Sequence, residues 1–157
     1  MSYYLRVFCS SASSVSRRDF VEFITEGVYF DSPRFEPPAN SPTLDDVMWK
    51  QFAVWYEPEK RPLLFYRHGD DEVLREEARE AADAMKEPST ASKKVVVGKL
   101  ATCKQLFVIE VNPGGITEEC WAMVDCLEAF LARRPDGIIY APDEGFYNAD
   151  LKLICKL

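Results

Sequence analysis

The only histidine of the chain, His68, stands just ahead of two carboxylates, and this is the first place where acid–base chemistry could occur. Asp70 and Asp71 follow it within three residues. A histidine beside carboxylates can act as a general base with a raised pKa. No neighbour in the sequence supplies a nucleophile. We therefore expect a surface position at a strand end, with His68, Asp70 and Asp71 as a candidate ligand site.

A second group of polar and aromatic side chains lies near the end of the chain. Asp143 and Glu144 precede Phe146 and Tyr147. Oxygen-rich loops can hold calcium or magnesium, but the alternating acids and distal glutamate of a calcium loop are missing. We expect no metal here. The pattern predicts a solvated turn, and we assign these four residues to a partner-binding surface in which exposed aromatic side chains accompany an acidic pair.

The cysteines and glycines do not complete a catalytic or cofactor motif. The chain has five cysteines, an odd set that lies mostly in apolar stretches, as reduced core thiols do. Cys120 and Cys126 are six residues apart on one predicted helix, so they lie on different faces and form no metal clamp. Gly114 and Gly115 precede that helix, but no P-loop lysine follows. We expect no cofactor and no catalytic residue set.

The charge balance bears on the choice of partner. Lysine and arginine total 19 against 26 acidic residues, a formal charge of −7. Affinity for a nucleic-acid backbone depends on lysine and arginine, so nucleic acid is disfavoured. No apolar run approaches a membrane-spanning length, and the start lacks the apolar core of a signal peptide. We expect a cytoplasmic protein whose partner is a basic protein or a second copy of the chain.

Local signals predict the elements of the first half. Residues 3–9 form a β-prone run, and Ser16 with Asp19 makes a capping box for a helix that Gly27 ends. Four prolines predict a long loop at residues 30–43. Two aromatic and aliphatic runs, 49–56 and 62–67, predict a hairpin. A helix follows at Asp70 and Asp71, and Pro88 is expected to end it.

The second half alternates helices and strands. Residues 92–100 are ambiguous, because three valines favour a strand while the surrounding lysines fit a helix, and we prefer the helix. A strand at 106–111 and a turn at 112–115 lead to a helix that Thr117 caps and that ends at Arg133 and Arg134. Residues 138–140 and 151–157 then predict two further strands.

This order predicts an α+β fold in a single domain, residues 1–157, with a proline-rich loop around 30–43. The first six elements follow the β-α-β-β-α-β order of a ferredoxin-like core, an antiparallel sheet with helices on one face. An α-β(-β) extension completes the chain. Such a fold leaves function to be argued from the site.

The C-terminal quarter carries a resemblance. A helix followed by RRPDGIIY at residues 133–140 and DEGFY at residues 143–147 resembles the tails of small uncharacterised bacterial α+β domains, some immunity proteins among them. The resemblance includes no catalytic motif, and it implies an immunity-like binding protein.

Two functional hypotheses follow. The first is a non-enzymatic binding or regulatory protein with an acidic docking surface for a basic target. The alternative is a small-molecule sensor or enzyme with a cavity between sheet and helices, using His68 and the acids beside it. The aromatic residues fit either hypothesis, because they can line a core or an interface.

Overall fold

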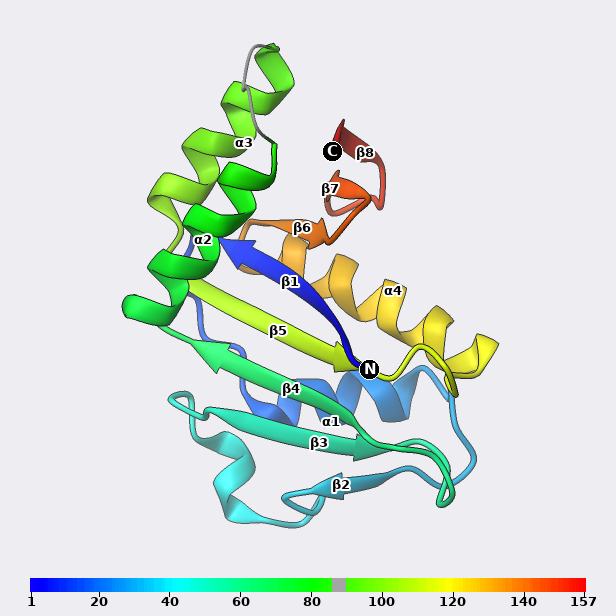
Figure 1. Cartoon of the computed structure of the whole chain (residues 1–157). Helices are drawn as coiled ribbons and strands as arrows, with labels where there is room; N and C mark the ends of the chain where they lie inside the picture. Colours follow the sequence, from blue (N-terminus) through cyan, green and yellow to red (C-terminus); the bar gives the residue numbers. More distant parts are fainter. Residues whose placement is uncertain (86–89) are drawn as a thin grey trace.

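The centre of the molecule is one open sheet of eight strands in the order β2-β3-β4-β5-β1-β6-β7-β8, with every neighbouring pair antiparallel (Figure 1). The computed structural model describes residues 1–85 and 90–157. The α+β class and the antiparallel sheet predicted from the sequence are confirmed. The strands are β1 (Tyr3–Cys9), β2 (Arg34–Glu36), β3 (Gln51–Trp55), β4 (Leu63–His68), β5 (Gln105–Val111), β6 (Gly137–Ala141), β7 (Gly145–Tyr147) and β8 (Leu153–Lys156).

Four α-helices and one 3-10 turn accompany these strands in the described part of the chain. They are α1 (Arg17–Glu26), α2 (Glu72–Ala84), α3 (Ala91–Thr102), α4 (Glu118–Arg133) and the 3-10 turn η1 (Pro42–Asp45). The segment that was ambiguous in the sequence is the helix α3. Pro88, which we expected to end α2, lies outside the described residues.

The helix starts follow from capping side chains. Ser16 and Asp19 form the predicted capping box, with the Ser16 amide donating to Asp19 Oδ2 at 2.7 Å. Thr117 accepts from the amide three residues later, at 3.2 Å, and so begins α4. Asp71 caps α2 in the same way at 2.9 Å. Each cap satisfies one of the amides that a first helical turn leaves unpaired.

The helices cover both faces of the sheet, which corrects the prediction that they lie on one face. The central strand β1 is apolar on both sides: Leu5, Val7 and Cys9 face a core shared with α1 and α4, whereas Phe8 faces a core shared with α2 and α3. Figure 1 shows the two helix pairs on opposite sides. Because strand side chains alternate, a strand buried on both sides needs a cover on each.

The strand order also differs from the one predicted for the first six elements. A ferredoxin-like arrangement of those elements needs β1 between β4 and β5, but β5 lies between β4 and β1. That arrangement of those elements is therefore not confirmed. Instead β5 and β6 run parallel to each other, because both are antiparallel to β1, and α4 joins them.

The proline-rich loop is more ordered than its composition suggests. Within and just beyond residues 30–43 it contains β2 and the turn η1. Phe35 anchors β2, because its buried ring stacks on Phe52 at 5.9 Å. No helix in the described residues has the length and apolar character needed to cross a membrane.

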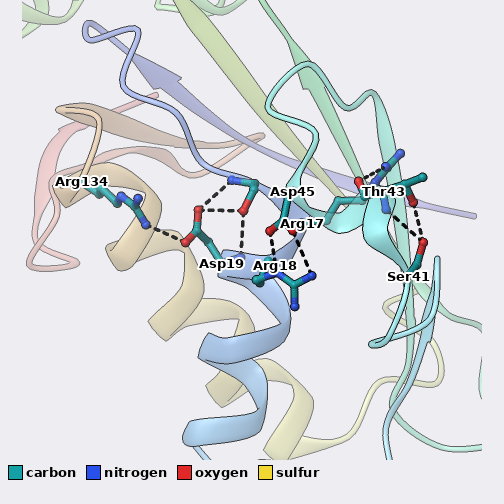
Figure 2. A network of polar contacts seen from close by, with 8 residues as sticks. Arg17, Arg18, Asp19, Ser41, Thr43, Asp45 and Arg134 are labelled. Atoms are coloured by element: carbon teal, nitrogen blue, oxygen red, sulfur yellow. Dashed lines mark hydrogen bonds and ion pairs between the residues drawn. The ribbon is translucent and has the colours of Figure 1, made fainter.

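Polar contacts fix the two helices on the α4 side of the sheet relative to each other (Figure 2). Arg134, which follows α4, lies 3.1 Å from Asp19 in the first turn of α1. Arg18 pairs with Asp45 of η1 at 2.6 Å. The first pair joins the end of α4 to the start of α1, and the second joins α1 to η1; both are partly exposed and add little stability individually.

Candidate functional site

The acidic turn identified in the sequence connects β6 to β7. Asp143 and Glu144 are exposed, and Asp143 adopts a left-handed conformation with φ of 67° that aspartate tolerates. The Tyr147 hydroxyl donates to Glu144 Oε1 at 3.2 Å. Three of the four expected residues therefore lie at the surface or partly so.

Phe146 does not, and the expectation that it is exposed is wrong. Its side chain has no exposed area, and its ring stacks on Tyr140 at 4.8 Å. The cause is the period of the strand: Tyr147 and Phe146 are consecutive in β7, so they point to opposite faces. Phe146 belongs to the core under α2 and α3.

The residues of the second predicted group, around His68, make local contacts at the end of β4 and the start of α2. His68 ends β4, and its Nδ1 lies 3.5 Å from Asp71 Oδ2. Asp71 caps α2, and Asp70 pairs with Arg75. His68 lines a shallow pocket with Glu77, but neither aspartate lines it. The structure brings His68 and Asp71 together without forming a shared cavity.

A different cavity joins the acidic turn to α4, and we call it the acidic pocket. It has a volume of about 250 Å³ and lies between the sheet and α4. In the part of the chain that the structure describes, three of its lining residues carry carboxyl groups, three are aromatic, and none is basic. The lining residues are Tyr3, Leu5, Trp121, Asp125, Glu128, Ile139, Ala141, Glu144, Tyr147 and Leu151.

Glu128 is the unusual residue of the acidic pocket. It is only 4% exposed and makes no hydrogen bond or ion pair within the described residues. Burial raises the pKa of its carboxyl group to about 8, and the charges of Asp125 and Glu144 add to this shift. At neutral pH Glu128 is therefore mostly protonated. The carboxyl oxygens of Glu128 are not fully enclosed, so they remain accessible from the cavity that the residue lines.

Burial and nearby negative charge also raise the pKa of other titratable groups in the pocket. Burial and the charge of Glu144 raise the pKa of Asp125. The Tyr3 hydroxyl lies 3.1 Å from Glu144 Oε2 and 3.1 Å from the Pro142 carbonyl oxygen. Burial and the Glu144 carboxylate raise the pKa of Tyr3 and of Tyr147, so both phenols stay protonated. Each oxygen of Glu144 thus accepts from one tyrosine, which fixes the carboxylate at the pocket rim.

Sequence reasoning found Glu144 and Tyr147 but missed Glu128, Asp125 and Tyr3. The sequence contains a pattern that could have identified Glu128. It follows Val124 by four residues and Cys120 by eight, so it lies on the buried stripe of α4, where a carboxylate is uncommon. Nothing in the sequence places Tyr3 of β1 against the same helix.

Metal and thiol chemistry find little support. Among the described residues, no group of three or more histidine, cysteine, aspartate or glutamate side chains is placed to hold a metal ion. Cys120 is fully buried, and burial together with Glu57 raises the pKa of its thiol to about 12. A thiol shifted in that direction is a poor nucleophile.

Comparison of the chain with protein-family models, with curated proteins and with solved structures finds no match.

Proposed function

We propose that the protein is a non-enzymatic binding protein that uses the acidic pocket and the turn at Asp143 and Glu144 to bind a basic surface of a partner protein. One observation carries this proposal: carboxyl groups from α4 and from the β6–β7 turn line a single cavity, and none of the described residues that line it is basic. The net charge of −7 supports it, because complementary potentials steer association and fix register.

Binding to a panel of labelled peptides tests the proposal. The panel holds basic, neutral and acidic peptides of equal length. We expect the basic peptides alone to bind, with an affinity that falls as salt is added. The double variant Asp143→Lys, Glu144→Lys should lose this binding. A matched control, Glu22→Lys with Glu26→Lys on α1, changes the net charge equally and should retain it. Equal loss in both variants, or no binding of basic peptides, would contradict the proposal.

The alternative function, a small-molecule sensor or enzyme with a cavity between sheet and helices, has one observation in its favour. The acidic pocket lies between the sheet and α4, and it contains an acid, Glu128, that holds its proton near neutral pH. Perturbed acids are common in active sites. A metabolite that raises the melting temperature would support this alternative, because a ligand of the folded state adds stability by mass action.

We also propose that part of the sheet is a ferredoxin-like unit built from other elements than the first six. Its strands would be β4, β5, β1 and β6, in that spatial order, with α1 and α4 as its helices. Two relations support this. The strand β1 lies between the parallel strands β5 and β6 that α4 joins, and β5 lies between the parallel strands β1 and β4. On this proposal α2 and α3 are an addition on the opposite face.

A further inference from the structure

The acidic pocket has negative groups without a counter-charge. Asp125, Glu128 and Glu144 line it, and no lysine, arginine or histidine of residues 1–85 and 90–157 does. Close carboxylates repel one another unless a proton or a cation intervenes. In the free protein, the proton on Glu128 reduces this repulsion. A cationic ligand would reduce it further, because it could neutralise all three carboxyl groups.

We propose that the acidic pocket accepts one arginine side chain of the partner protein, with the guanidinium group against the carboxyl groups of Glu128 and Asp125 and its plane against the aromatic wall. This inference rests on the proposed function and names the group that the partner presents. An arginine inserted into a pocket at the centre of an interface is a common energetic hot spot.

Glu128 distinguishes the acidic pocket from an ordinary cluster of surface acids. Glu128 is only 4% exposed and lines the cavity, and its carboxyl oxygens make no hydrogen bond within the described residues but remain accessible from the cavity. Buried polar groups in folded proteins almost always have a partner. A carboxyl group that lacks one inside the chain, and that borders a cavity, is suited to bind a donor from outside.

The shape and lining of the pocket favour arginine over other cations. Its volume of about 250 Å³ is below the range of roughly 300–1,000 Å³ that drug-sized ligands occupy, so it fits a single side chain. Tyr3, Trp121 and Tyr147 line it, and a planar guanidinium stacks on aromatic faces. Guanidinium is also more weakly hydrated than ammonium, so its transfer into a half-buried site costs less. A metal ion is disfavoured, since the carboxyl groups are not grouped as ligands.

Proton release is the expected signature of this binding mode. The groups that face Glu128 are Asp125 on its own helix, Tyr3 of β1, Glu144 of the turn and Tyr147 of β7, and none of them is basic. An arginine at this site favours the charged form of Glu128, so binding near pH 6.5 should release up to one proton. Well above the pKa of Glu128 it should release none.

The experiment uses the full chain and three matched peptides. These are acetyl-Gly-Gly-Arg-Gly-Gly-amide, its lysine counterpart and its citrulline counterpart, which keeps the shape of arginine without the charge. Titrations followed by NMR report on the indole signal of Trp121. We expect the arginine peptide to shift this signal and to bind at least about tenfold more tightly than the citrulline peptide. Calorimetry in buffers of different ionisation enthalpy measures the released protons.

Two variants decide the role of Glu128. The variant Glu128→Gln should lower the affinity for the arginine peptide at least about tenfold and abolish proton release. The variant Glu119→Gln, an exposed control on the same helix, should change neither the affinity nor the proton release. The arginine assignment would be overturned if the citrulline peptide bound as tightly as the arginine peptide, or if Glu128→Gln bound the arginine peptide as tightly as the wild type does. If basic peptides still bind and only the turn variant Asp143→Lys, Glu144→Lys loses them, the assignment fails and the proposed function stands. If no basic peptide binds, both fail.

Discussion

Replacing the buried Glu128 by glutamine should stabilise the protein at neutral pH. The carboxyl group has a reference pKa of 4.5 and a pKa of about 8 in the folded chain. Glutamine has nearly the same shape and no charge to desolvate. The variant therefore removes the cost of keeping Glu128 protonated in the folded state at a pH where the unfolded chain would release the proton.

The sign and size of the effect follow from this difference in pKa. Because the folded pKa is the higher one, the folded chain binds a proton that the unfolded chain has lost between pH 4.5 and 8. The contribution of Glu128 to the free energy of unfolding is fully present below that window and is lost as pH rises through it, by about 1.4 kcal/mol per pH unit. At pH 7 the variant should be more stable by about 3 kcal/mol, which corresponds to a rise in melting temperature of roughly 6–12 °C for a chain of this size.

Urea unfolding followed by tryptophan fluorescence, repeated from pH 4.5 to pH 8.5, measures this. The wild-type and Glu128→Gln curves should meet at the acidic end and diverge as pH rises. Glu119→Gln, on the exposed surface of α4, should run parallel to the wild type. Wild-type and Glu128→Gln curves that stay parallel across the whole range would refute the argument, because they would mean that Glu128 is charged in the folded protein.

Substitutions at three further positions test the packing and capping around the candidate sites. Gly145→Ala should detach β8, because a Cβ atom there would lie 2.3 Å from the Cys155 carbonyl oxygen, and hydrogen exchange of the β8 amides should accelerate. Phe146→Ala should destabilise the fold by about 3–5 kcal/mol in chemical denaturation, as a buried ring does, whereas a loss under about 0.5 kcal/mol would mean that Phe146 is exposed after all. Asp71→Ala should cost about 1 kcal/mol through loss of the cap on Leu74, and Asp71→Ser should recover most of it; equal losses would exclude the capping role.

Signals confined to a few neighbouring residues allowed much of the secondary structure to be predicted. The capping box at Ser16 and the caps at Asp71 and Thr117 mark three helix starts, because a side chain and the amide it accepts from are within three residues of each other. The α+β class followed from the order of these elements. The strand order did not, since it depends on pairings such as β1 with β5, which are about a hundred residues apart.

The candidate site was predictable only where one segment builds it. The turn at Asp143 and Glu144 is local, and the sequence identifies it. Phe146 was misplaced because its acidic neighbours suggested a solvated loop, although the alternation of a strand sends it inward. Glu128 becomes significant only when Tyr3 of β1 and the β6–β7 turn are packed against α4, an arrangement that the tertiary fold alone creates.

The lengths of the strands across the sheet have a consequence for how the protein meets other chains. The central strands β1 and β5 have seven residues each, while the outermost strands β2 and β8 have three and four. An outer strand exposes unpaired backbone groups that could template fibril growth or accept an added strand from a partner. Edge strands of three and four residues offer few such groups. Edge-to-edge polymerisation of the molecule is therefore disfavoured, and recognition through side chains is favoured over recognition through its backbone.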